Sequence, residues 1–301
     1  MKKYLLVSFM TAVMLGGCST KSADSDTSME PPVDMNDSGE TTEKFEINYS
    51  LMYDQKTQDK IMSLLKENKV PQQNMEAFFD YVNDFNTVVG PMKGSEAGFH
   101  TGNILGRLFD YGRIYDAWME KRSYSDVNCR LTAFTLMKDF IKTNTETIEV
   151  PEENPIDFDM EVVKDIPLIK FSDDELKKYY HFYSAIPTVE STNKAILLES
   201  IHQEWENRGI EFEMNDGISL VSIFLHYPDS KTLYIGHTGV LIKTDKGYLF
   251  LEKVAPLDVF MATQYHSLED FKDYLEVLYG NMTIPGGSSP LFLLNDQLLN
   301  Q

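Results

Sequence analysis

The sequence contains few of the residues that define several common protein classes. Among its 301 residues there are two cysteines, two tryptophans and 27 lysines and arginines. Two cysteines cannot form the dense disulfide framework of a small secreted scaffold. The 47 acidic residues give a formal net charge of −20, and no basic face is evident. We therefore do not expect nucleic acid as a partner.

Metal-binding spacings are also missing from the sequence. The six histidines form no His-Glu-x-x-His motif, and no Cys-x-x-Cys pair is present, so we expect neither a metal site nor another cofactor. What is present is an ordinary globular balance, with 42% hydrophobic and 25% charged residues. This balance excludes a wholly disordered chain and a collagen-like fibre.

The N-terminus has the pattern of an export signal. Lys2 and Lys3 precede an apolar run over residues 4–15, and two glycines follow the run. The run is too short for a stable membrane-spanning helix, and small residues follow it as they do at signal-peptide cleavage sites. We therefore predict that residues 1–17 are a signal peptide.

The residues around the predicted cleavage site, Leu15-Gly16-Gly17-Cys18, resemble a bacterial lipobox. The resemblance implies that Cys18 is acylated and becomes the mature N-terminus. It also implies that the protein is anchored in the lipid bilayer, at the extracytoplasmic face of the cell membrane. The alternative is an ordinary signal peptide in which Cys18 is incidental.

A polar segment follows the predicted signal. Residues 18–46 are rich in Ser, Thr, Asp, Glu and Pro and have no hydrophobic period. Such a segment cannot bury enough apolar surface to offset its ordering entropy, so we predict a disordered acidic tether. Residues 47–301 are then predicted to form a single folded domain.

The folded part is predicted to begin with helices and to end with strands. Apolar residues recur with helical spacing across residues 47–127, which we interpret as a helical subregion. Further helices are predicted over 128–142 and within a segment at about 144–210, where Ser172-x-x-Glu175 forms a capping box. Strands are predicted over 220–226, 233–243 and 248–254, the last two joined by the turn Thr244-Asp245-Lys246-Gly247. This order of elements predicts an α+β fold rather than a parallel α/β sheet.

Cys129 is the cysteine that remains if Cys18 is acylated, and a leftover cysteine in an exported chain is a free thiol. Ser125-Asp126-Val127-Asn128 supplies helix-capping residue types directly before it, so the thiol is predicted to lie in the first turn of a helix. There the helix dipole and the free N–H groups favour a thiolate and can hold an oxyanion. Asn128 is a candidate for the cap or for a second oxyanion donor. The alternative for Cys129 is a small buried hydrophobic residue.

A nucleophilic cysteine needs a base and a group that orients this base. His237 is the best placed of the histidines, because it lies within a predicted strand and has small neighbours. Glu252, on the next strand of the hairpin, is predicted to accept the Nδ1 proton of His237 and to hold the ring towards Cys129. The alternatives are a structural histidine, and a Glu252 that faces solvent or pairs with Lys253.

A cysteine at a helix N-terminus, followed by a His-x-Gly-Val strand and a polar residue on the next strand, resembles the papain-like fold. In particular it resembles the NlpC-type cell-wall peptidases and amidases, whose patterns are Asp-Cys-Ser-Gly and His-Val-Gly-Ile. The corresponding stretches here are Asn128-Cys129-Arg130-Leu131 and His237-Thr238-Gly239-Val240. The chain as a whole also resembles a family of bacterial lipoproteins described only as a domain of unknown function.

The resemblance implies a papain-like antiparallel sheet core over residues 128–301, with a helical insertion at about 144–210 and the helical subregion packed against it. It also implies a Cys129–His237–Glu252 triad in which the thiolate attacks an amide or ester carbonyl. Asn128 and Arg130-Leu131 replace the family's Asp and Ser-Gly, a departure that bears on the substrate more than on the fold.

Three functions remain open at this point. The first is a membrane-anchored cysteine peptidase or amidase that acts on peptidoglycan peptides of the cell envelope. The second is a non-catalytic surface lipoprotein that binds an envelope partner. Its signature would be a blocked cleft, or a Cys129 and a His237 too far apart to form a hydrogen bond. The third is a thiol acyltransferase or esterase on the same fold.

Overall fold

The computed structural model describes residues 45–103, 109–143, 148, 154–213, 215–253 and 255–299. Lys44–Gln301 forms one compact unit, which contains all of these residues. The predicted signal peptide, Cys18 and nearly all of the predicted tether lie outside the described residues, and so does part of the segment at about 144–210.

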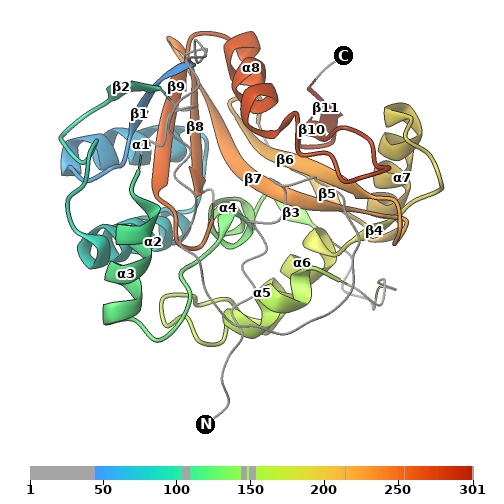
Figure 1. The fold of residues 1–301 in the computed structure, drawn as a ribbon, viewed down its shortest axis with the longest axis horizontal. Helices are drawn as coiled ribbons and strands as arrows, with labels where there is room; N and C mark the ends of the chain where they lie inside the picture. Colours follow the sequence, from blue (N-terminus) through green and yellow to red (C-terminus); the bar gives the residue numbers. More distant parts are fainter. Residues whose placement is uncertain are drawn as a thin grey trace, which may run out of the picture. The chain divides into compact units, whose positions relative to one another are not determined.

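An antiparallel sheet is the largest element of the fold (Figure 1). Its strand order within the described residues is β11-β10-β6-β7-β8-β9-β1-β2, and the short strand β4 pairs with β7. The strands are β1 (Glu46–Ser50), β2 (His100–Asn103), β4 (Ile186–Pro187), β6 (Ile218–Tyr227), β7 (Thr232–Thr244), β8 (Gly247–Lys253), β9 (Phe260–Tyr265), β10 (Leu291–Leu294) and β11 (Gln297–Leu298). A separate pair of short strands consists of β3 (Ile141–Lys142) and β5 (Glu211–Phe212).

Helices pack around this sheet. They are α1 (Gln55–Glu67), α2 (Gln72–Val89), α3 (Tyr111–Lys121), α4 (Cys129–Met137), α5 (Ile156–Val162), α6 (Asp173–Tyr183), α7 (Lys194–Asn207) and α8 (Leu268–Tyr279). Helix α4 packs on β7, on β8 and against α2, and α8 packs on β8 and β9. In Figure 1, α5 and α6 lie below β6 and β7, and α8 lies above them. The predicted α+β class is confirmed.

Helix α4 occupies the interior of the domain. Eight of its nine residues are buried, and Arg130 is the exception. A short helix that is apolar on every side belongs in a core, and here β7, β8 and α2 enclose it. The first residue of α4 is therefore held at a fixed place inside the domain.

Two parts of the predicted secondary structure need correction. The segment 47–127, predicted to be helical, also contains β1 and β2, and β1 pairs with β9 in the main sheet. Buried and exposed residues alternate in β1, but over too few residues to stand out beside the helical periods. The helix predicted over 128–142 ends at Met137, and β3 begins at Ile141.

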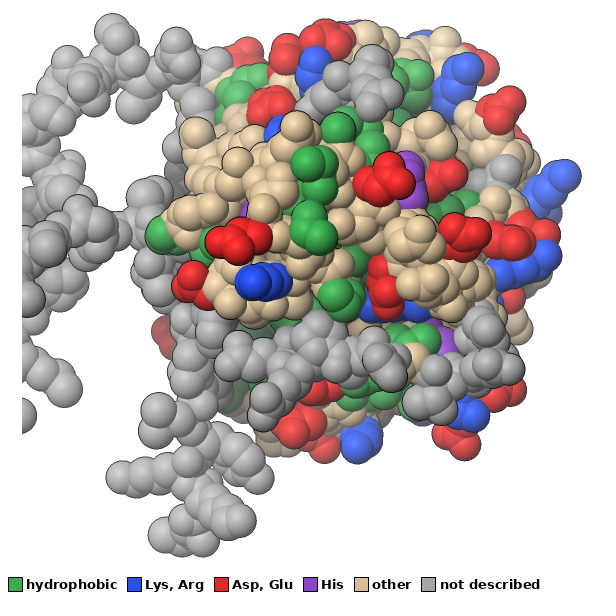
Figure 2. Space-filling view, turned by 90° about the vertical axis from the view of Figure 1, so that its right-hand side faces the viewer, with side chains coloured by type: hydrophobic (Ala, Val, Ile, Leu, Met, Phe, Trp, Pro, Cys, Tyr) green, Lys and Arg blue, Asp and Glu red, His purple; other side chains and the backbone are tan. Residues whose placement is uncertain are grey.

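Acidic and basic side chains are interspersed on the face of the molecule shown in Figure 2. Acidic side chains are the more frequent on this face, in line with the net charge of −20. Within the portion of the chain that the structure describes, no helix is both long enough and apolar enough to cross a membrane.

Candidate active site

Cys129, the candidate nucleophile, is the first residue of α4. Asn128 caps this helix, because its Oδ1 accepts a hydrogen bond from the N–H of Leu131 at 2.9 Å. The prediction that the thiol lies in the first turn of a helix is therefore confirmed. Within the described residues, the N–H groups of Cys129 and Arg130 have no hydrogen-bond acceptor. Such free donors are normal at a helix start and are available to a ligand.

His237 lies on β7 next to an irregularity in the strand. The pairing of β6 with β7 shifts register between Ile235 and His237, which leaves Gly236 as the extra residue of a β-bulge. A Cβ atom at Gly236 would lie 2.5 Å from Cδ1 of Leu225, so a larger residue does not fit without movement. Because bulges bend a strand and redirect its side chains, we infer that this one sets the direction of the imidazole.

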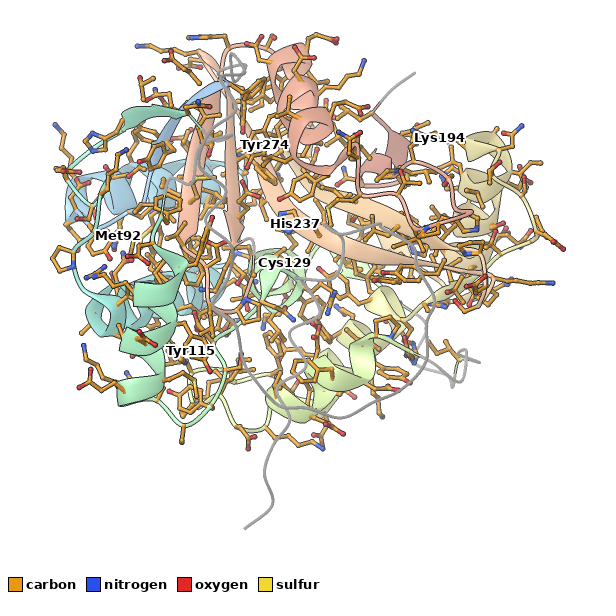
Figure 3. The ribbon with its side chains drawn as sticks, in the orientation of Figure 1. Met92, Tyr115, Cys129, Lys194, His237 and Tyr274 are labelled. Carbon is orange, nitrogen blue, oxygen red and sulfur yellow. The ribbon has the colours of Figure 1, made fainter. Side chains whose placement is uncertain are left out.

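The imidazole of His237 joins Cys129 to Glu252. Its Nε2 atom lies 2.8 Å from Oε2 of Glu252, and the ring lies close enough to the Cys129 side chain for each group to shift the pKa of the other. Figure 3 shows the labelled Cys129 and His237 next to each other, where the start of α4 meets β7. The structure thus brings all three predicted side chains together.

One detail of the predicted triad needs correction, because Nε2 of His237 and not Nδ1 faces the carboxylate. Glu252 pairs across the strands with Gly239, two residues beyond His237. The imidazole therefore spans a diagonal of the sheet and reaches the carboxylate with its distal nitrogen. The Nδ1 atom is the nitrogen left for the thiol.

The electrostatics of the pair favour its charged form. Burial raises the pKa of Cys129, but the charge and hydrogen bond of His237, together with the charge of Arg130, hold it below its usual value. Burial lowers the pKa of His237, but Cys129 and Glu252 raise it to about 9. Both shifts run in the direction that favours a thiolate next to an imidazolium.

Two tyrosines of α8 hold Glu252, whose side chain is buried. The hydroxyl of Tyr274 donates to Oε1, and that of Tyr279 donates to Oε2 at 3.3 Å. The Tyr279 ring also stacks on His237, with centroids 4.9 Å apart and planes at 14°. The alternative of a solvent-facing Glu252 is therefore wrong. Sequence reasoning missed both tyrosines, because nothing in their spacing sets them apart from the other aromatic residues of the predicted helices.

A second cluster, centred on Asp159 of α5, fixes the start of α4. The buried Asp159 carboxylate accepts hydrogen bonds from the Arg130 guanidinium at 2.7 and 2.9 Å. It also accepts from Asn128 Nδ2 at 2.7 Å and from the Tyr179 hydroxyl at 2.6 Å. Arg130 donates in addition to the carbonyl of Ile235 on β7 at 3.2 Å. Both ends of the Asn128 side chain are engaged, so Asn128 supports the helix rather than donating into the site.

One known family matches the chain over a range that includes the whole site. Residues 48–299 match the model of a family described as a domain of unknown function, DUF4300. The chain belongs to this family. No curated protein and no solved structure matches the chain. The match spans every element that builds the site, from α4 to α8.

A buried ion pair lies beside the site of this DUF4300 domain. Lys253, the neighbour of Glu252 on β8, lies 2.5 Å from Asp126 and donates to the carbonyl of Asp258 at 2.9 Å. Its ammonium group lies 4.0 Å from the ring centroids of Phe85 and Phe260. Burial raises the pKa of Asp126 to about 6, although Lys253 opposes this rise. Lys253 therefore pairs with the segment that leads into α4, and not with Glu252.

The site of the DUF4300 domain is closed to solvent. Cys129 is 5% exposed and His237 is 3% exposed. Cavities of about 580 and 410 Å³ lie elsewhere, the first beside Met92 and Arg113 and the second beside Met160 and His181. A substrate has to displace covering side chains before it reaches the thiol. Within the described ranges, no group of three or more His, Cys, Asp or Glu side chains could hold a metal ion.

The pH dependence of Cys129 alkylation tests whether the thiol forms an ion pair with His237. We expect iodoacetamide to modify Cys129 with an acid limb below the ordinary thiol pKa of 9.0, because His237 stabilises the thiolate. Glu252→Gln should move this limb upward, because the carboxylate that supports the imidazolium is lost. The measurement is the alkylation rate of both proteins as a function of pH. Identical limbs at the ordinary thiol value would contradict the expectation.

The free energy of unfolding should fall as the pH rises through the pKa of His237. The folded-state pKa of His237 is raised from 6.5 to about 9. The stabilisation is therefore fully present below pH 6.5 and is lost as the pH rises through about 9. Denaturant unfolding of the wild type and of Glu252→Gln over this range measures the difference.

Proposed function

We propose that this chain is a cysteine hydrolase, a peptidase or amidase, with Cys129 as nucleophile, His237 as base and Glu252 as the group that orients the base. The observation that carries the proposal is the position of His237 between the Cys129 thiol, whose pKa it lowers, and a buried carboxylate to which it is hydrogen-bonded. A histidine with only a structural role would not require a neighbouring thiol with a lowered pKa.

The proposed reaction follows the geometry. The Cys129 thiolate adds to the carbonyl carbon of an amide, and the His237 imidazolium gives its proton to the departing amine. The resulting thioester on Cys129 is hydrolysed by a water that His237 deprotonates. Glu252 and the stacked Tyr279 ring keep the imidazole in one orientation during both steps.

The arrangement of the elements supports a papain-like core. The nucleophile begins a buried helix, α4, and this helix packs on the two antiparallel strands, β7 and β8, that carry the base and its partner. This order agrees with the resemblance of Asn128-Cys129-Arg130-Leu131 and His237-Thr238-Gly239-Val240 to the NlpC-type motifs. Helices α5 and α6 would then be an insertion that supports the nucleophile.

The proposed location follows from the N-terminal sequence. Residues 1–17 as signal peptide and an acylated Cys18 would place the domain at the extracytoplasmic face of the cell membrane, with the lipid bilayer as its anchor. At that surface, the amide bonds of peptidoglycan peptides are the substrates proposed for the thiol.

The burial of Cys129 favours one alternative, a non-catalytic surface protein that keeps the fold and binds an envelope partner. A thiol that never becomes accessible would make the hydrogen-bonded pair a structural element of the core. The two functions predict different reactivities of the Cys129 sulfur atom.

Selective alkylation and cleavage together test the proposal. The full chain is incubated with peptidoglycan fragments and with activated esters, and iodoacetamide labelling is located by peptide mass spectrometry. We expect cleavage by the wild type, none by Cys129→Ala, and labelling at Cys129. Cys18→Ala is the matched control, since it removes the other cysteine and should leave both results unchanged. Inertness towards peptides and esters, with no selective labelling, would refute the enzyme.

A further inference from the structure

The hydroxyl of Tyr183 is a buried polar group for which the described residues offer no hydrogen bond. Tyr183 is the last residue of α6 and is 2% exposed, and its hydroxyl has no hydrogen-bond partner within the residues that the structure describes. A buried O–H that gives up its bonds to water without replacing them destabilises the fold. Such a group therefore calls for an explanation, and one explanation is a ligand that binds there.

Tyr183 occupies the same face of α6 as a residue that already supports the nucleophile. Tyr179 lies one turn earlier, and residues four apart share a helix face. The Tyr179 hydroxyl binds Asp159, which in turn holds the start of α4. The ring of Tyr183 lies 4.9 Å from that of Tyr179 and 6.3 Å from that of Phe134 on α4. Tyr183 therefore points towards the nucleophile helix.

Residues at the start of α4 and on β7 influence the Tyr183 hydroxyl. Burial raises the pKa of Tyr183, and the nearby Cys129 thiolate raises it further. Thr238, which follows His237 on β7, lies close enough to oppose this rise, although its hydroxyl forms no hydrogen bond with Tyr183 within the described residues. The Thr238 hydroxyl itself donates to the carbonyl of Val221 at 2.6 Å. The Tyr183 proton is thus held on its oxygen, on a ring that packs against α4.

The N–H groups of Cys129 and Arg130 are free at the start of α4 within the described part of the chain, and the Asn128 side chain is engaged on both sides. A side-chain donor from another element would complete an oxyanion hole with these backbone groups. We propose that the Tyr183 hydroxyl is the side-chain hydrogen-bond donor of the oxyanion hole and contacts the carbonyl oxygen of an acyl substrate. The inference rests on the proposed cysteine hydrolase function and adds a catalytic residue to it.

The chemistry of the step defines what Tyr183 does. The Cys129 thiolate forms a bond to the carbonyl carbon, and the π electrons of the C=O bond move to its oxygen. This oxyanion accepts hydrogen bonds from the Cys129 N–H and the Tyr183 O–H. When the C=O bond re-forms, the bond to the leaving group breaks, and an amine leaves with the proton of His237. Tyr183 keeps its proton throughout.

Two reagents separate this role from a general effect on the thiol. p-Nitrophenyl acetate acylates a thiolate through an oxyanion and releases p-nitrophenolate, whereas iodoacetamide alkylates it by displacing iodide without forming an oxyanion. In the full chain, we expect Tyr183→Phe to slow acylation of Cys129 by about 100-fold. Alkylation should keep the wild-type rate. Labelling sites are checked by mass spectrometry.

Stability is the second readout. Tyr183→Phe removes a hydroxyl that has no partner, so the midpoint of thermal unfolding should stay the same or rise. Tyr180→Phe is the matched control, because Tyr180 precedes Tyr183 on α6 but lines the cavity beside Met160 and His181. This control should acylate and alkylate like the wild type.

Each remaining outcome counts against the inference. An unchanged ratio of acylation to alkylation in Tyr183→Phe would overturn the donor role and leave the hydrolase proposal standing. A parallel fall in both rates, or a clear fall in the unfolding midpoint, would show that the hydroxyl supports the thiol or the fold instead. A wild-type Cys129 that reacts with neither reagent would overturn both proposals.

Discussion

Replacing His237 with alanine should reduce turnover by about 10⁴-fold or more. The imidazole is the partner that lowers the pKa of the Cys129 thiol, and it is the group that would protonate the leaving amine. Both contributions disappear together in the variant. The measurement is turnover on the substrate identified for the wild type, together with the pH dependence of iodoacetamide alkylation, whose acid limb should rise.

His226→Ala is the control for the loss of a buried imidazole. His226 lies on the neighbouring strand β6, is 3% exposed and accepts a hydrogen bond from the N–H of Ser288 at 3.1 Å. It takes no part in the Cys129–His237–Glu252 series. We expect its removal to affect stability more than turnover. Equal losses of turnover in the two variants would mean that His237 acts through the fold.

Replacing Lys253 with methionine should destabilise the folded protein by about 3–5 kcal/mol, because it leaves the Asp126 carboxylate buried without its cation. The contacts of the ammonium group with Phe85 and Phe260 are lost as well. The free energy of unfolding, measured in urea, gives the size of the effect.

The penalty of Lys253→Met should depend on pH. Burial already raises the pKa of Asp126 to about 6 while Lys253 is present. Without Lys253 this pKa rises further, so the carboxyl group becomes neutral and the penalty shrinks as the pH falls. Asp126→Asn combined with Lys253→Met should recover part of the loss at neutral pH. A double variant no more stable than Lys253→Met would contradict the ion-pair explanation.

Parts of the candidate site were predictable from residues that lie close together in the sequence. Asn128 is a capping residue type directly before Cys129, and the start of α4 follows from that pair. His237 and Glu252 lie on two strands joined by a tight turn, so a short separation along the chain brings them together. Local rules decide both arrangements, and the structure agrees with both.

The partners of these residues were not predictable in the same way. Asp159 of α5 binds Arg130 at the start of α4, and Tyr179 and Tyr183 of α6 pack against Asp159 and α4. Tyr274 and Tyr279 reach Glu252 from α8. Each is one of many acidic or aromatic residues in helices whose packing depends on the whole fold. The β-bulge of β7 at Gly236 and the nitrogen that faces Glu252 also became known only from the structure.

By itself, the sequence determined the α+β class, the helix start at Cys129 and the pairing of His237 with Glu252, because caps, tight turns and residue periods act over short distances. Only the tertiary structure decided that β1 and β2 extend the sheet, that α5 and α6 hold the start of α4 and that the Cys129 thiol is closed to solvent. These features depend on contacts between segments far apart in the chain, and such contacts form only when the whole core packs.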